Sequence, residues 1–139
     1  MEPNAPSNSF SDADLEDSKD LDRRFVDAIN RKDLDATMAC LWDDPGLVFI
    51  LDGVTFKGTE AVRGAIRNLF EAHEELGLEV NEVSHVPSGD AIIGVGTATY
   101  HLKPKEGPPR LMIERWSDMR RKVNGKWVYA LDHTTQVDK

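Results

Sequence analysis

An acid and an imidazole stand side by side near the end of the sequence, at Asp132 and His133. Such a pair could move protons, because an imidazole titrates near neutral pH and burial can shift a carboxyl group into the same range. Both residues lie in "KWVYALDHTT", a run typical of a strand that follows the hairpin signal Asn124-Gly125. Successive side chains of a strand point to opposite faces of its sheet. Asp132 and His133 are therefore predicted to act separately, not as a hydrogen-bonded pair.

Regular alternation along this strand predicts two sets of side chains. Ala130, Asp132 and Thr134 would share one face. The other face would carry Trp127, Tyr129, Leu131 and His133. Arg115 and Ser117, on the preceding strand, could point to the same side as Asp132. An ion pair between Arg115 and Asp132 would be structural, whereas an Asp132 without that partner would be a candidate general acid or base.

Three other positions could take part in proton transfer. Asp52 is the second candidate acid or base, but Asp52-Gly53 is equally a hairpin-turn signal, so a structural role stays open. His73 closes the apolar stripe of a predicted helix, where a histidine at the edge of the core is the competing interpretation. Tyr100 and His101 are neighbours on a predicted strand, so one of them must point inward.

Composition narrows the classes of function. A net charge of -8 argues against nucleic acid as a partner, since phosphate binding needs a basic face. The single cysteine, Cys40, excludes an internal disulfide, and without metal-ligand spacing or a phosphate-binding loop we expect neither metal nor cofactor. No apolar run approaches the ~20 residues of a membrane span. The acidic N-terminal stretch lacks the apolar centre of a secretory signal, so a cytoplasmic location is expected.

The 139 residues predict a loosely packed or disordered arm over residues 1–11 and one domain over residues 12–136. Helix signals begin near residues 11, 33 and 58, and strand-like runs cover 47–51, 54–56, 78–86, 91–102, 110–123 and 126–135. Helices followed by antiparallel strands predict an α+β domain. We expect a cone-shaped, curved, mainly antiparallel sheet wrapped around three N-terminal helices and enclosing an apolar pocket. Gly94 and Gly96 are predicted to let the sheet bend.

Two stretches resemble the nuclear-transport-factor-2-like, or cystatin-like, superfamily. The first is "AINRKDLDATMACLWDDPGLVFILDGVTFKGTEAVRGAI", in which the matching residues are Asn30, Asp33, Leu34, Trp42, Asp43, Asp44, Gly58 and Val62. The second is "ERWSDMRRKVNGKWVYALDHTT", which is similar to the closing hairpin of the SnoaL-like branch and of the kinase association domain. Its matching residues are Ser117, Gly125, Trp127, His133 and Thr135.

The resemblance implies a fold more firmly than a function, because members of this superfamily include isomerases, cyclases, dehydratases, hydrolases, oligomerisation modules and transport adaptors. It implies that Ala130, Asp132 and Thr134 line the cavity. In the steroid isomerase branch the proton-abstracting carboxylate would fall near Asp52. The tyrosine and the second acid that stabilise the oxyanion would fall on Phe25 and Ser117, so steroid isomerase activity is not expected.

We therefore expect a small-molecule-binding SnoaL-like domain that acts as a cofactor-independent isomerase, cyclase or dehydratase on an apolar, carbonyl-bearing substrate. Asp132 and Asp52 are its candidate catalytic residues. The residues expected to contact the small hydrophobic ligand are Phe25, Trp42, Phe56, Phe70, Arg115, Ser117 and Ala130. The alternative is a non-catalytic dimerisation or ligand-binding module. A pocket filled by the four aromatic residues would favour the module, and an open pocket with Asp132 unpaired from Arg115 would favour an enzyme.

The apolar stripe of Trp127, Tyr129 and Leu131 is predicted to lie on the outer face of the sheet, together with Trp116 and Met112. An exposed stripe of this size indicates an interface, so a homodimer is expected. His133 would sit at the rim of that interface and make structural hydrogen bonds. A transport adaptor would need a further exposed apolar patch, which the sequence does not show.

Overall fold

The computed structural model describes residues 10–137, so most of the arm predicted over residues 1–11 lies outside the described residues. The helices are α1 (Asp12–Asn30), α2 (Leu34–Met38) and α3 (Thr59–Ala72). The first begins where predicted, because Ser11 and Asp14 form a reciprocal capping box. The second is capped by the side chain of Asp33, which accepts a hydrogen bond from a backbone N–H.

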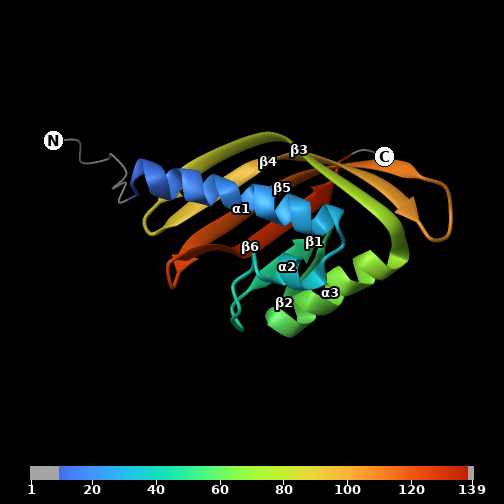
Figure 1. Cartoon of the computed structure of the whole chain (residues 1–139), viewed down its shortest axis with the longest axis horizontal. Helices are drawn as coiled ribbons and strands as arrows, with labels where there is room; N and C mark the ends of the chain where they lie inside the picture. The colour runs from blue at the N-terminus through green and yellow to red at the C-terminus, as the bar shows by residue number, and fades with distance from the viewer. Residues whose placement is uncertain (1–9, 138–139) are drawn as a thin grey trace.

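The strands form a single six-stranded sheet in the order β2-β1-β6-β5-β4-β3. Their bounds are β1 (Val48–Leu51), β2 (Val54–Lys57), β3 (His73–Ser88), β4 (Ala91–Pro104), β5 (Arg110–Val123) and β6 (Lys126–Gln136). Strands β3 to β6 make the predicted antiparallel meander, and β1 joins β6 in parallel. Figure 1 shows α1 lying along one face of the curved sheet, with α2 and α3 near β1 and β2. The predicted α+β fold, with helices against an open, mainly antiparallel sheet, is confirmed.

Strand β6 carries a bulge that regular alternation does not anticipate. Its register against β5 shifts by one residue between Met119 and Arg120, which leaves Ala130 out of the pairing. An extra residue on one strand changes the face that all later side chains take. Tyr129 and Asp132 consequently point to the same side of the sheet although they are three residues apart.

The prediction that the aromatic residues of β5 and β6 lie on the outer face of the sheet is wrong. Trp116, Trp127 and Tyr129 lie on the side of the sheet that α1 covers, and Trp127 and Tyr129 are only 2% and 5% exposed. The ring of Trp127 packs against Phe10 and the ring of Tyr129 against Phe25, each with centroids 5.2 Å apart. These aromatic side chains belong to the interior of the monomer and cannot form a dimer face in this fold.

The outer face of the sheet is apolar at other positions. Leu131 is half-buried and His133 is exposed there, as predicted, whereas Met112 points inward instead and packs against the core. The large apolar side chains exposed on the outer face of β3, β4 and β5 are Val86, Ile93, Val95, Leu111 and Ile113. Homodimerisation through the sheet stays a prediction, and these five residues lie on the outer face in place of the aromatic ones.

The two strand glycines are required because other atoms approach them closely. A Cβ atom on Gly96 would lie 1.9 Å from the carbonyl oxygen of Glu82. A Cβ atom on Gly94 would lie 2.9 Å from the guanidinium of Arg120 and 3.0 Å from the carboxylate of Asp118. Gly96 thus admits the bulged backbone of β3, and Gly94 makes room for a buried ion pair.

None of the helices within residues 10–137 has the length and apolar character needed to cross a membrane.

Candidate active site

A cavity with two lobes lies between α1 and the concave side of the sheet. The larger lobe has a volume of about 220 Å³, and its walls are mainly apolar side chains of α1, α3, β1, β4 and β5. Asp52 and Arg110 are exposed lining residues and mark its open side. The smaller lobe, of about 40 Å³, lies beside it against α1. Four side chains border both lobes, namely Phe25, Glu114, Asp132 and Thr134.

Glu114 and Asp132 are the carboxyl groups at the junction of the two lobes. Burial, and then the negative charge of Asp52, raise the pKa of Glu114 to about 7. Burial also raises the pKa of Asp132 well above its usual range, and the charges of Asp118 and Glu114 add to the effect. At neutral pH Glu114 is therefore divided between its acid and its carboxylate forms. The surroundings of Asp132 favour its acid form.

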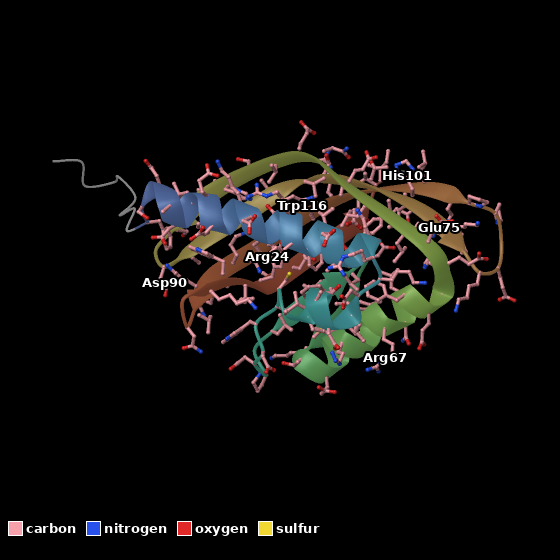
Figure 2. All side chains as sticks on the ribbon, viewed as in Figure 1. Arg24, Arg67, Glu75, Asp90, His101 and Trp116 are labelled. Carbon is pink, nitrogen blue, oxygen red and sulfur yellow. The ribbon has the colours of Figure 1, made fainter. Side chains whose placement is uncertain are left out.

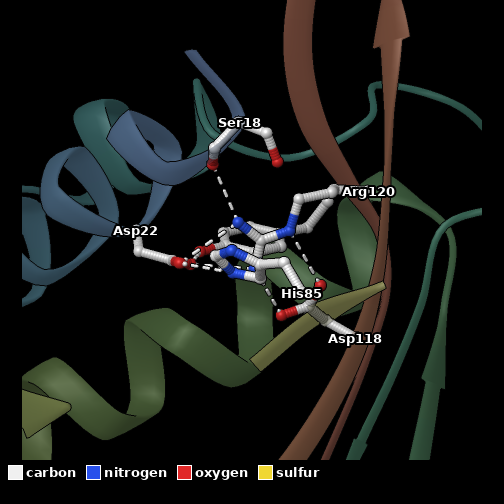
Figure 3. Close-up of polar contacts among 6 residues, drawn as sticks. Ser18, Asp22, His85, Asp118 and Arg120 are labelled. Carbon is white, nitrogen blue, oxygen red and sulfur yellow. Dashed lines mark hydrogen bonds and ion pairs between the residues drawn. The ribbon is translucent and has the colours of Figure 1, made fainter. Parts of the chain in front are cut away.

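A cluster of ion pairs surrounds Arg120 beside the smaller lobe (Figure 3). The guanidinium is fully buried and donates to Asp118 at 2.8 and 3.1 Å and to Asp22 at 2.9 and 3.1 Å. It also donates to the backbone oxygen of Ser18 at 2.8 Å and lies 5.0 Å from the ring centre of Tyr129. These contacts tie helix α1 to strands β5 and β6, and they fix the two carboxylates.

The pKa values of Asp22 and Asp118 shift in opposite directions although both carboxylates contact Arg120. Burial by itself would raise the pKa of Asp22, but contacts with His85, Arg120 and Tyr129 outweigh it, so the pKa is lowered and the group stays ionised. Burial dominates at Asp118 and raises its pKa to about 6 despite the guanidinium. The hydroxyl of Tyr129 donates a hydrogen bond to Asp22.

His85 on β3 faces Asp22 on α1, with Nε2 of the imidazole 3.2 Å from Oδ2 of the carboxylate. The two atoms are close enough for an ion pair, but their alignment does not meet hydrogen-bond geometry. The imidazole lines neither lobe. The His85–Asp22 pair can therefore hold charge beside the cavity, but it does not reach a ligand in the larger lobe.

Of the two predicted catalytic residues, only Asp132 lies inside the cavity. Asp52 is an exposed turn residue with a positive φ of 49°, and it lines the rim of the larger lobe. His133 is exposed on the opposite face from Asp132, so the predicted separation of this pair is confirmed. The prediction that Arg115 and Ser117 face the cavity is wrong. The β5 side chains that line the cavity are those of their neighbours Glu114, Trp116 and Asp118.

The predicted ligand-contacting residues divide in the same way. Phe25 borders both lobes, as expected. Trp42 lies outside them, with the guanidinium of Arg121 5.7 Å from its ring. Phe56, Phe70 and Ala130 pack in or against the core without lining either lobe. Of the four aromatic residues, only Phe25 borders the cavity, so they do not fill it together.

Two polar neighbours of the cavity were left undecided by the sequence. His73 and Tyr100 line the larger lobe, where Nδ1 of His73 lies 2.8 Å from the backbone oxygen of Leu69. His101 projects outward from the sheet, 3.3 Å from Glu79 (Figure 2). Tyr100 is consequently the inward member of its pair.

Sequence reasoning missed most of the buried polar residues. Glu114, Asp118 and Arg120 lie on the same face of β5 as Met112 and Trp116, and this even spacing of charged and apolar residues was the available signal. Asp22 and His85 had no such signal, because their elements meet only in the folded chain. Among residues 10–137, no group of three or more His, Cys, Asp or Glu side chains is placed to hold a metal ion.

Comparisons with known proteins agree with this architecture. The SnoaL-like domain family matches residues 23–130, and no curated protein matches the chain. A nuclear transport factor 2-like protein from Salmonella enterica superimposes with a TM-score of 0.82 at 15% identity, covering 90% of this chain and 91% of that one.

Two further solved structures are similar at the same level. A type 2 hexachlorocyclohexane dehydrochlorinase (LinA) has a TM-score of 0.80 at 17% identity, covering 91% of this chain and 86% of its own. A proposed dehydratase of the NTF2-like family from Streptomyces avermitilis has a TM-score of 0.78 at 18% identity, covering 92% and 99%. Identities this low show the shared fold alone, whereas the family match spans most of the chain. The chain belongs to the SnoaL-like domain family.

Proposed function

We propose that this protein is a cofactor-independent enzyme that moves a proton on an apolar, carbonyl-bearing substrate, as an isomerase, cyclase or dehydratase does. The observation that carries the proposal is the position of Glu114 and Asp132 at the junction of an otherwise mainly apolar cavity. An apolar pocket with a few convergent polar groups of shifted pKa is the usual form of a small-molecule active site.

The two carboxyl groups suit opposite halves of a proton transfer. A general base works best when its pKa lies near the working pH, and the pKa of Glu114 is about 7. A neutral carboxylic acid can donate a proton or a hydrogen bond, and burial favours that form of Asp132. Glu114 is therefore the proposed proton acceptor, and Asp132 the proposed donor to an oxygen atom of the substrate.

The neighbouring ion cluster is proposed to position these groups without reacting. Asp22 is a weak base because its pKa is lowered, and Arg120 is fully buried behind the smaller lobe. The charge of Asp118 raises the pKa of Asp132 and so helps to keep it protonated.

Two features support an enzyme over a ligand-binding module. The larger lobe remains open, because Trp42, Phe56 and Phe70 do not line it. Asp132 is not engaged by Arg115, which is exposed. Two of the similar structures are named as a dehydrochlorinase and a proposed dehydratase, and such eliminations also begin with proton movement.

The proposal can be tested by deuterium exchange with simple ketones. Cyclohexanone, 2-cyclohexenone and 2-tetralone are incubated with the protein in D2O, and NMR measures exchange at the carbon next to the carbonyl group. The intact protein should accelerate exchange of at least one ketone, and Glu114→Gln should reduce the acceleration by about 10²- to 10⁴-fold. Arg115→Gln is the matched control on the same strand and should exchange normally. Exchange at the buffer rate with all three ketones would contradict the proposal.

A further inference from the structure

The smaller lobe is large enough to hold water. Its volume of about 40 Å³ exceeds the roughly 10–15 Å³ that one water molecule needs and is far smaller than the volume of the larger lobe. A buried water also needs two to four polar partners. The lobe supplies carboxyl groups from Asp22, Glu114, Asp118 and Asp132.

The same lobe contains a hydrogen-bond donor that lacks a partner. Trp116 lines the lobe where α1 crosses the sheet (Figure 2), and its indole Nε1 is buried without a hydrogen-bond partner among residues 10–137. Leaving such a donor unsatisfied is costly, so buried polar groups are normally paired. An oxygen atom in the lobe that lay within hydrogen-bond reach of Nε1 would satisfy this N–H.

The charges around the lobe favour a neutral occupant over an anion. Asp22 and Asp118 contribute two carboxylates against the single guanidinium of Arg120. Asp22 stays ionised, and Asp118, with a pKa of about 6, is mostly ionised at neutral pH. A halide or another anion would be repelled, whereas water can both donate to the carboxylates and accept from the indole.

We propose that the smaller lobe is a water site in which Trp116 holds the oxygen that the substrate loses or gains, so that the reaction is the reversible dehydration of an apolar β-hydroxy carbonyl compound. This inference rests on the proposed function and narrows it to one reaction class. It also gives the smaller lobe a purpose distinct from that of the larger one.

The two acids at the junction complete the reaction with all atoms accounted for. The carboxylate of Glu114 takes a proton from the carbon next to the carbonyl group, and that C–H electron pair forms the carbon–carbon double bond. The bond from the neighbouring carbon to the hydroxyl oxygen breaks, and its electrons go to the oxygen. Asp132 gives its proton to this oxygen, and the water formed occupies the smaller lobe. Passing one proton from Glu114 to Asp132 restores the starting state.

The test compares cyclohexanone with 3-hydroxycyclohexanone by NMR, following the indole N–H signals of the protein. Only the hydroxyl-bearing compound should move the Trp116 signal, and its hydroxyl group should tighten binding by roughly 3- to 10-fold. Trp116→Phe should remove this gain. Trp127→Phe is the matched control. The indole nitrogen of Trp127 is also buried without a partner in the described part of the chain, but Trp127 lines neither lobe.

A second variant, Ala98→Val, fills the lobe from β4 and should also abolish the gain while leaving the binding of cyclohexanone unchanged. Equal binding of the two compounds with an unmoved Trp116 signal would overturn the water site and leave the proposed function standing. Binding of neither compound would overturn the proposed substrate class, and the water-site inference with it.

Discussion

Replacing Glu114 by glutamine should change how the stability of the protein depends on pH. The carboxyl group has a pKa of about 7 in the folded chain against a reference value of 4.5. A raised pKa means that the folded state binds the proton more tightly than the unfolded state does. Well below pH 4.5 the Glu114 carboxyl group is protonated in both the folded and the unfolded chain, and its contribution to the free energy of unfolding is fully present. As the pH rises from there to above 7, the unfolded chain is the first to ionise, and folding loses free energy.

The size of this loss follows from the shift in pKa. A shift of two and a half pKa units corresponds to roughly 3 kcal/mol of unfolding free energy. This stabilisation is lost between the two pKa values and is gone once the pH lies above about 7. Glu114→Gln keeps the shape of the side chain and removes the titration. The substitution also removes a charge that raises the pKa of Asp132. This second effect likewise reduces the loss of stability at high pH. The variant should therefore be the more stable protein in alkaline solution.

Urea denaturation, followed by tryptophan fluorescence at about pH 5 and about pH 8.5, gives the four free energies required. The loss of stability between the two pH values should be smaller in Glu114→Gln than in the unaltered protein by roughly 3 kcal/mol. Glu71→Gln, at an exposed position of α3, controls for removing an acid. An identical pH dependence in the variant and the unaltered protein would refute the raised pKa of Glu114.

Three further substitutions test other parts of the structure. Arg120→Met should destabilise the protein by roughly 3–5 kcal/mol in urea denaturation, because it leaves Asp22 and Asp118 buried without their cation; a loss under 1 kcal/mol would contradict the ion cluster. Gly96→Ala should lower the melting temperature sharply, because its Cβ would lie 1.9 Å from a backbone oxygen of β3; unchanged melting would show that β3 does not approach there. Gly64→Ala, on α3 with open space around it, should instead add roughly 0.5–1 kcal/mol, and calorimetry would detect a wrong sign.

The helices, the turns and the order of the strands could be predicted from the sequence because local chemistry decides them. The start of β3 was predicted wrongly, since the strand begins at His73, which the apolar pattern assigned to the third helix. Ser11 and Asp33 cap helices, and Asn124-Gly125 makes a hairpin, without help from distant parts of the chain. The inward position of Asp132 was also predicted, through the family resemblance. These features require only short-range patterns.

The faces of β5 and β6 could not be predicted, because a bulge leaves no reliable trace in the sequence. One extra residue at Ala130 brings Tyr129 to the same side as Asp132, and strict alternation therefore assigned Trp127 to the wrong face. The same error placed Arg115 in the cavity in place of its neighbour Glu114. Contacts across the fold, such as the one between Asp22 on α1 and His85 on β3, depend on packing that no local pattern encodes.

The central claim is that Glu114 and Asp132 keep protons near neutral pH at the junction of the cavity. Carbon-13 NMR of the side-chain carboxyl carbons measures this directly, with Glu114→Gln and Asp132→Asn used to assign the two signals. Glu114 should titrate with a pKa of about 7, and Asp132 should remain protonated well above the usual range of an aspartate. Titration of both groups at their ordinary values, near 4.5 and 3.8, would contradict the account.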